Sequence, residues 1–285
     1  MEKIAILVFA LGLVFSCKNE NKTTVEEETI EVKDTPKITL QVVNGGDITV
    51  NKLEAFSDSL HLYQGQSKVF VDPIYIITHK SGKRMIWDTG LPEAIGSEPV
   101  TPGDGTFTIA RKDSIGHQLK TLDLTYEDFD YIGISHIHFD HTGTANYFKN
   151  ATWLVQENEY DFITSPEQAT GLGAAVSELK NVQKLNGDHD VFGDGSVIIK
   201  STPGHTVGHQ SLYLDLGLER PILLTGDLYH FQENRQSKVS PSFNYDFPQT
   251  RESMAVFEAF AKEKNAEVII QHSPMDLTKL QNILK

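Results

Sequence analysis

Residues 135–143 read Ser-His-Ile-His-Phe-Asp-His-Thr-Gly, and this stretch indicates both the fold and the chemistry of the chain. Its side chains that can bind a metal are His136, His138, Asp140 and His141. The stretch follows an apolar segment that we expect to be a short buried strand. His136 and His138 project the same way while the chain stays extended, and a loop can then turn Asp140 and His141 towards a second point. The segment can therefore supply two ligands to each of two neighbouring ions.

A polar surface loop with accidental histidines is the alternative for this stretch. The chain has 11 histidines among 285 residues. Three of them in so short a pattern, with an aspartate between, are improbable by chance. The pattern therefore favours a metal site.

Three further segments share one arrangement, in which an apolar strand ends at a possible ligand. His205 follows residues 197–204, Asp227 follows Leu-Leu-Thr-Gly, and His272 follows Val-Ile-Ile-Gln. Taken alone, each is more often an ordinary loop residue. Their repeated placement behind residues 135–143 predicts that they complete the metal sites.

Composition excludes several classes of protein. With 39 acidic against 25 basic residues and a formal charge of −14, broad nucleic-acid binding is excluded, because phosphate contacts need clustered Lys and Arg. One cysteine can form neither an intrachain disulfide nor a Cys-rich zinc module. The length allows one large domain or two small ones.

The N-terminus predicts export. Lys3 precedes an apolar run over residues 4–15, which is too short for a membrane span. Ser16 and Cys17 end a sequence that resembles a bacterial lipobox, so residues 1–17 are expected to be a lipoprotein signal peptide with Cys17 acylated. An uncleaved anchor helix or a chance apolar start is the alternative. If Cys17 is acylated, the protein would reside in the periplasm or at the outer membrane and would contact the membrane only through this lipid anchor.

The remaining chain divides into a tether and a domain. Residues 18–37 are highly charged and lack aromatic side chains, which predicts a flexible tether. Residues 38–285 are expected to form the metallo-hydrolase domain. Its expected strands are residues 38–43, 47–53, 69–78, 84–87, 131–135, 152–156, 210–215, 222–225 and 268–271, with a hairpin around 187–200. Its expected helices are residues 114–122, 158–163, 166–180 and 250–264, with another beginning at 144–148.

The turns and loops of the domain can also be predicted. Asn44-Gly45-Gly46 is predicted to be a turn between two strands, and residues 92–106 and 231–248 to be long loops that could line a pocket. Strands occur first in runs and then alternate with helices. We therefore expect an α/β protein, with two mixed sheets between helices in a four-layer αββα sandwich.

The histidine stretch, together with His205, Asp227 and His272, resembles the metallo-β-lactamase superfamily. The resemblance covers residues 38–285. Within the superfamily, residues 134–143 and residues 202–211 (Thr-Pro-Gly-His-Thr-Val-Gly-His-Gln-Ser) are most similar to N-acyl homoserine lactonases.

The resemblance implies a role for each candidate ligand. His136, His138 and His205 would hold a first divalent ion, and Asp140, His141 and His272 a second, with Asp227 bridging the two. Zinc suits such nitrogen and oxygen donors, although Mn, Fe or Co would also fit. A hydroxide bridging the ions would attack the carbonyl of a neutral acyl lactone, which is the implied small-molecule partner and whose cleavage would constitute quorum quenching.

The resemblance also implies residues that assist. Asp140 would pass a proton to the leaving oxygen. In the lactonases a Tyr three positions after the bridging Asp donates to the oxyanion; here that position is His230, preceded by Tyr229, and either side chain could donate. Asp88 resembles a carboxylate that orients a ligand histidine, with a plain turn residue as the alternative. His209 is expected to be structural rather than a ligand.

Three other functions compete with a lactonase. A β-lactamase of this superfamily lacks the bridging Asp, and many use a Cys near its place, whereas this chain has Asp227 and only Cys17. A glyoxalase-II-like thioesterase would keep all seven ligands but should have basic residues for glutathione, and no such cluster is evident near the C-terminus. A non-catalytic surface binding lipoprotein would be free to lose some ligands. The sequence predicts neither acyl-chain preference nor oligomeric state.

Overall fold

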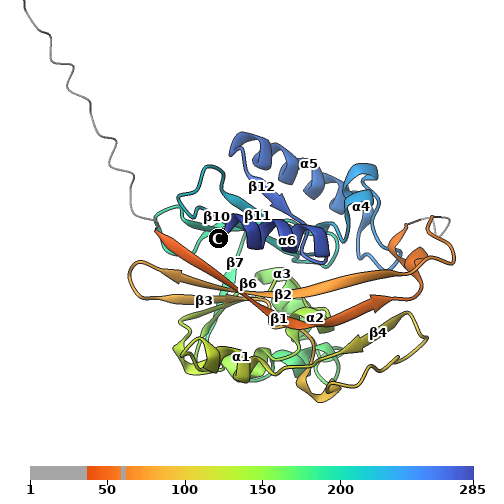
Figure 1. Ribbon diagram of the computed structural model, residues 1–285, viewed down its shortest axis with the longest axis horizontal. Coiled ribbons are helices and arrows are strands. Elements are labelled where there is room, and N and C mark those ends of the chain that lie inside the picture. Colours follow the sequence, from red (N-terminus) through yellow and green to blue (C-terminus); the bar gives the residue numbers. More distant parts are fainter. Residues whose placement is uncertain (1–36, 59–61) are drawn as a thin grey trace, which may run out of the picture. The chain divides into compact units, whose positions relative to one another are not determined.

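The computed structural model describes residues 37–58 and 62–285. The predicted signal peptide, Cys17 and all but the last residue of the predicted tether lie outside the described residues. The domain that follows contains two β-sheets with helices on their outer faces (Figure 1).

Among the described residues, seven strands form the first sheet in the order β4-β1-β2-β3-β5-β6-β7, and five form the second in the order β12-β11-β10-β9-β8. The strands of the first sheet are β1 (Ile38–Val50), β2 (Lys68–His79), β3 (Arg84–Trp87), β4 (Phe107–Ala110), β5 (Tyr131–Gly133), β6 (Thr152–Gln156) and β7 (Val182–Leu185). Those of the second are β8 (His189–Asp190), β9 (Val197–Ser201), β10 (Gln210–Leu214), β11 (Ile222–Leu224) and β12 (Glu267–Ile269).

The helices among the described residues are α1 (Ile115–Thr121), α2 (Phe139–Thr142), α3 (Glu157–Ile163), α4 (Gln232–Ser237), α5 (Phe247–Glu263) and α6 (Pro274–Ile283). Short 3-10 turns cover Leu53–Phe56, Glu93–Ile95, Tyr126–Asp128, Ala145–Phe148, Leu172–Val176 and Gly226–Leu228. None of these helices combines the length and the apolar character that a membrane span requires.

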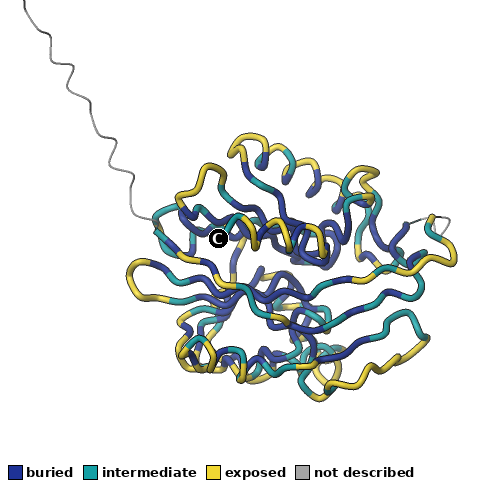
Figure 2. Tube along the Cα trace, in the orientation of Figure 1, coloured by how far each residue is buried: buried dark blue, intermediate teal, exposed yellow. Residues whose placement is uncertain are grey.

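Buried side chains separate four layers. On β2, Tyr75 and Ile77 belong to a cluster shared with β10 and β11 of the second sheet, whereas Ile74 and Ile76 pack in a cluster with α1. This alternation follows from the two-residue period of a strand, and a strand covered on both faces is apolar throughout. A third cluster lies between the second sheet and α5. The predicted four-layer αββα sandwich is confirmed, and its buried residues follow the strands and the inner sides of the helices (Figure 2).

The predicted turn at residues 44–46 is wrong, because β1 runs through it as one strand. β1 pairs with β2 on both sides, from Ile38 opposite His79 to Val50 opposite Lys68, and only the register shifts at Asn44 and Gly46. A side chain at Gly45 would place its Cβ 2.8 Å from Gly90 Cα. The glycines therefore admit a close backbone approach rather than a chain reversal.

The predicted helix over residues 166–180 is also wrong, because only the 3-10 turn Leu172–Val176 forms there. A Cβ at Gly173 would lie 2.6 Å from the carbonyl oxygen of Ile163. The chain packs tightly back against the end of α3 at this point, and glycine also disfavours a continuous helix. Strands β4 and β7 and helices α4 and α6 were not predicted.

Candidate metal centre and apolar cavity

The histidine stretch begins just beyond the end of β5, which the structure holds on both sides. The Ser135 N–H donates to Asp88 Oδ1 at 2.6 Å, and the Ser135 carbonyl accepts from the Gln210 N–H of β10 at 2.9 Å. These bonds join the end of β5 to both sheets. The chain then turns into α2, which carries Asp140 and His141.

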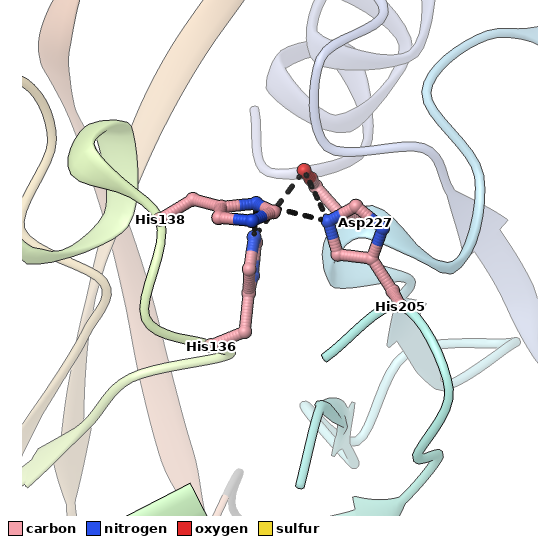
Figure 3. A group of neighbouring side chains, drawn as sticks. All are labelled: His136, His138, His205 and Asp227. Carbon is pink, nitrogen blue, oxygen red and sulfur yellow. Dashed lines mark hydrogen bonds and ion pairs between the residues drawn. The ribbon is translucent and has the colours of Figure 1, made fainter. Parts of the chain in front are cut away.

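His136, His138, His205 and Asp227 form the first group of possible ligands (Figure 3). His138 Nδ1 lies 2.9 Å from His136 Nε2 and 3.1 Å from His205 Nε2. Asp227 Oδ2 lies 3.4 Å from the Nε2 atoms of both His136 and His205. The donors therefore converge on one point from three separate chain segments.

Asp140, His141 and His272 form the second group. His141 Nε2 lies 3.3 Å from His272 Nε2, and each lies 3.8 Å from a carboxylate oxygen of Asp140. Asp227 Oδ1 lies 3.4 Å from His141 and 2.9 Å from His272. Asp227 thus turns one carboxylate oxygen towards each group, so the structure brings together all seven predicted ligands.

The donor set fits metal ions. Four ligands bound tetrahedrally at about 2.0–2.1 Å lie about 3.3 Å apart, which matches the separations among the first four donors. Asp227 Oδ1 is buried, yet among the described residues it accepts no well-formed hydrogen bond. Burial and the neighbouring imidazoles hold the pKa values of His136 and His138 well below the usual value, which leaves these rings neutral and able to coordinate.

The second group differs in its electrostatics. Burial lowers the pKa of His272, but the carboxylates of Asp227 and Asp140 outweigh it and raise the value to about 9. Burial likewise raises the pKa of Asp227, while His230, His272 and His141 together hold it well below its usual range. Asp227 is therefore ionised and carries negative charge to the centre of the site.

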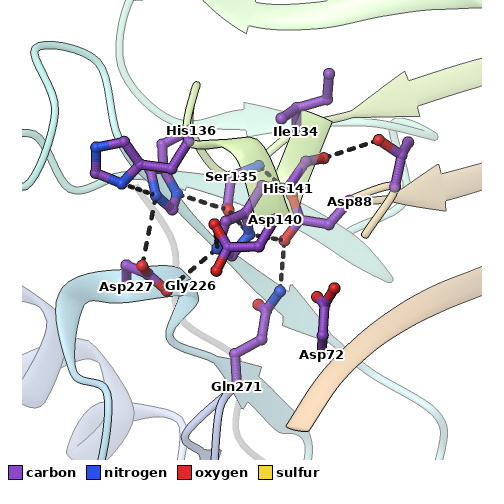
Figure 4. A network of polar contacts seen from close by, with 12 residues as sticks. Asp72, Asp88, Ile134, Ser135, His136, Asp140, His141, Gly226, Asp227 and Gln271 are labelled. Atoms are coloured by element: carbon purple, nitrogen blue, oxygen red, sulfur yellow. Dashed lines mark hydrogen bonds and ion pairs between the residues drawn. The ribbon is translucent and has the colours of Figure 1, made fainter. Parts of the chain in front are cut away.

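Several groups orient the ligand imidazoles through their second nitrogen. His141 Nδ1 donates to Asp88 Oδ2 at 2.9 Å, so the predicted orienting role of Asp88 is confirmed (Figure 4). His205 Nδ1 donates to Asn244 Oδ1 at 3.0 Å, and His272 Nδ1 donates to the Val71 carbonyl at 2.8 Å. Such partners set the tautomer and direction of a ligand histidine. No sequence signal pointed to Asn244 or Val71.

His209 has a structural role, as predicted. The Asp227 N–H donates to His209 Nε2 at 2.9 Å, and His209 Nδ1 donates to the Thr202 carbonyl at 3.0 Å. Burial lowers the pKa of His209 to about 3, so the ring stays neutral and keeps this pair of bonds. His209 positions the backbone of the shared carboxylate.

Tyr229 and His230 lie on opposite sides of the chain. His230 lines the cavity beside the ligands, with Nε2 3.0 Å from Asp227 Oδ2. The Tyr229 ring packs against Phe257 of α5 in the outer cluster, and it is not among the residues that line the cavity. The prediction that Tyr229 could donate to the site is therefore corrected, and His230 is the one that reaches it.

An apolar cavity of about 160 Å³ opens onto the candidate ligands. Its apolar wall consists of Ile48, Phe56, Phe70, Phe107, Phe139 and Phe243, and its polar end of His138, Asp140, Asp227, His230 and His272. Of the two loops expected to line a pocket, residues 231–248 contribute Phe243, whereas residues 92–106 contribute none of the wall. In the part of the chain that the structure describes, no Lys or Arg lines this cavity.

Comparison with known proteins identifies the family. Residues 69–272 match the model of the metallo-β-lactamase superfamily. The chain belongs to this superfamily. It is 32% identical over 215 residues to the N-acyl homoserine lactonase AttM of Rhizobium radiobacter, covering 71% of this chain and 81% of the relative. It is 29% identical over 206 residues to the N-acyl homoserine lactonase AiiA of Bacillus thuringiensis, covering 70% of this chain and 79% of that protein.

Solved structures show the same superfamily fold. An N-acyl homoserine lactone hydrolase with N-hexanoyl-L-homoserine bound at its catalytic metal centre superposes with a TM-score of 0.74. The match covers 86% of this chain and 96% of that chain at 24% identity.

The two-sided position of Asp227 generates a prediction about metal content. Replacing Asp227 with Ala removes the carboxylate that faces both groups of candidate ligands, so we expect D227A to bind less than half of the metal that the wild-type chain binds. Elemental analysis of the purified protein measures this. Asp140→Ala should lower mainly the metal occupancy of the second group. Asp161→Ala, at an exposed position, should leave the metal content unchanged. Full occupancy of both sites in D227A would contradict the bridging role.

Proposed function

We propose that this superfamily member opens the lactone ring of N-acyl homoserine lactones as a metal-dependent carboxylic ester hydrolase, and so acts in quorum quenching. The observation that carries the proposal is a phenylalanine-walled cavity ending on two groups of metal-binding side chains that share Asp227. An apolar wall suits an acyl chain, whose burial contributes about 0.8 kcal/mol per methylene. The relatives named N-acyl homoserine lactonases support the same substrate class.

The proposed cofactors are two divalent ions, most simply zinc, held by His136, His138, His205 and Asp227 and by Asp140, His141, His272 and the same Asp227. When bound, such ions activate a water molecule at neutral pH and polarise a carbonyl oxygen. The chain's own contribution is to direct these donors from both sheets and to keep the cavity wall apolar.

Asp140 is the side chain that we propose moves the proton. Its carboxylate lines the cavity beside the ligands and is partly accessible, at 14% exposure. As the water oxygen bonds to the lactone carbonyl carbon and the ring C–O bond breaks, Asp140 takes the proton of the water and gives it to the ring oxygen. The product is an N-acyl homoserine with a free hydroxyl and a carboxylic acid, which releases the second proton of the water to solvent at neutral pH.

His230 is the side chain that we propose stabilises the charge on the carbonyl oxygen. Its Nε2 faces Asp227 Oδ2 at the polar end of the cavity, and the ring is held edge-on by Phe56 with centroids 4.8 Å apart. A donor fixed in this way needs little reorganisation when charge develops. His230 thus stands where the resemblance to lactonases places a tyrosine.

The competing hydrolase functions fit the cavity less well. A glutathione thioester carries carboxylates, and among residues 37–58 and 62–285 no Lys or Arg lines the cavity to receive them. The Asp227 bridge and the location of the only cysteine at Cys17 argue against a β-lactamase. A non-catalytic binding protein would have no need for seven converging donors.

A substrate panel tests the proposed function. With zinc-loaded protein, we expect kcat/KM for short- and long-chain N-acyl homoserine lactones to exceed that for a glutathione thioester and a β-lactam by about 100-fold or more. Removal of metal by a chelator should abolish turnover, and re-addition should restore it. Metal-loaded protein that hydrolyses no lactone, or that prefers the thioester, would overturn the proposal.

Separate variants at the two neighbouring positions test the oxyanion donor. His230→Leu should lower kcat/KM for the lactone by about 100-fold, because a donor to the developing charge is lost. Tyr229→Phe should leave the rate unchanged, because this hydroxyl faces away from the cavity. Metal content is measured in both variants, since His230 also contacts Asp227. An unchanged rate in H230L with both ions retained would rule out His230 as the donor.

We also propose that the protein is an exported lipoprotein anchored through acylated Cys17. Lys3, the apolar run over residues 4–15 and the small residue Ser16 support this proposal. Expression of the full-length chain in a Gram-negative host should place it in the membrane fraction, and Cys17→Ala should prevent acylation. An unacylated Cys17 in the wild-type chain, found by mass spectrometry, would refute the anchor.

A further inference from the structure

Glu159 of α3 is a buried carboxylate outside the donor set, and only 2% of it is exposed. It accepts three hydrogen bonds: from the Ile137 N–H at 3.0 Å, the Thr206 hydroxyl at 2.8 Å and the Gly208 N–H at 2.7 Å. No Lys or Arg pairs with it among the hydrogen bonds and ion pairs of the described residues. The carboxylate is held by these three donors alone.

The three donors belong to the two loops that supply the histidines of the first group. Ile137 lies between His136 and His138, and Thr206 directly follows His205. One carboxylate of α3 therefore joins two chain segments that lie far apart in the sequence. Its donor Ile137 packs in the cluster between the first sheet and the outer helices, which holds that loop from its other side.

Glu159 and the loop that carries His205 and Gly208 approach each other closely. A Cβ at Gly208 would lie 2.7 Å from Glu159 Cβ and 2.8 Å from the Glu159 nitrogen. Any larger residue at position 208 would push the loop away from α3. Burial raises the pKa of Glu159, whereas its three hydrogen bonds lower it and so favour the ionised carboxylate.

Asp88 has the corresponding position beside the second group. Its carboxylate contacts His141 Nδ1 directly, and Gln271 Nε2 donates to the same oxygen at 2.5 Å. Glu159 instead reaches backbone and hydroxyl groups next to the ligands. Asp88 thus contacts a ligand of the second group directly and also accepts from the Ser135 N–H beside His136, whereas Glu159 contacts only the loops of the first group.

We infer that Glu159 is a positioning residue that sets the geometry and the affinity of the site formed by His136, His138 and His205. The inference rests on the proposed metal centre but not on the identity of the substrate. Loss of the hydrogen bonds of Glu159 lets the two loops separate. Binding of the ion held by His136, His138 and His205 is then weakened selectively. A residue that only stabilised the fold would weaken both ions alike.

Two variants test this inference on the full-length protein. Glu159→Gln keeps the size of the side chain, but its NH2 group must face one of the donors, so at least one of the three hydrogen bonds is lost. Thr206→Val removes the hydroxyl donor alone and preserves shape, which provides a milder change if E159Q folds poorly. Glu157→Gln is the matched control, because Glu157 lies on the same helix with 54% of its side chain exposed.

Stepwise zinc affinities, measured by competition with a chromophoric chelator, are the main readout. We expect E159Q to lower the zinc affinity of the site formed by His136, His138 and His205 by about 10- to 100-fold, which is typical when a group that orients a metal ligand is lost. The affinity of the other site should change little. T206V should give a smaller change in the same direction, and E157Q none. Asp88→Asn should weaken mainly the ion held by Asp140, His141 and His272, because Asp88 contacts His141 Nδ1 directly. Anomalous diffraction at the zinc edge identifies which site has lost occupancy.

Three outcomes would overturn the inference: equal weakening of both ions in E159Q, selective loss at the Asp140, His141 and His272 site, or wild-type affinities in both E159Q and T206V. Thermal unfolding of the metal-free variants separates a general loss of stability from a local one. If wild-type protein binds both ions without hydrolysing lactones, the proposed function fails while the inference stands. If wild-type protein binds no zinc, both fail.

Discussion

Asp227 is a buried carboxylate surrounded by imidazoles, and the rest of the structure is arranged to hold it there. One oxygen faces His136 and His205 and the other faces His141 and His272, at distances of 2.9 to 3.4 Å. Burial of an ionised carboxylate is costly unless opposite charge or hydrogen bonds compensate. Metal ions at the two groups would supply that charge, and His209 meanwhile accepts from the Asp227 backbone.

This arrangement requires both sheets to end at the same place. Asp227 follows β11 in the interior of the second sheet, and the histidine stretch follows β5 of the first sheet. The apolar cluster between the sheets fixes their distance, and a polar layer at its edge joins them through Ser135, Asp88 and Gln271 (Figure 4). The donors are therefore placed by core packing and held by hydrogen bonds.

Much of the fold and of the donor set was predictable because the signals are local. A short apolar strand followed by His or Asp is visible at each of the four strand ends that carry ligands. The sequence-based predictions failed where tertiary contacts outweigh local signals. β1 continues through Asn44 and Gly46 because β2 pairs with it on both sides of Gly45, and Gly90 packs against Gly45. Helix α6 does have a local signal in the sequence: Ser273 caps its N-terminus and Pro274 is its first residue.

The seven candidate ligands and the superfamily could be predicted from sequence motifs and their resemblance to known proteins, and the four-layer architecture from the order of the expected strands and helices. Which of Tyr229 and His230 faces the cavity depends instead on tertiary packing. Tyr229 has extended backbone angles, so the two neighbouring side chains point in opposite directions, and packing of Tyr229 against α5 selects the direction of each. Asn244, the Val71 carbonyl and Glu159 likewise reach the ligands or their loops from segments distant in sequence. Such contacts depend on how the layers pack, which residue spacing does not encode.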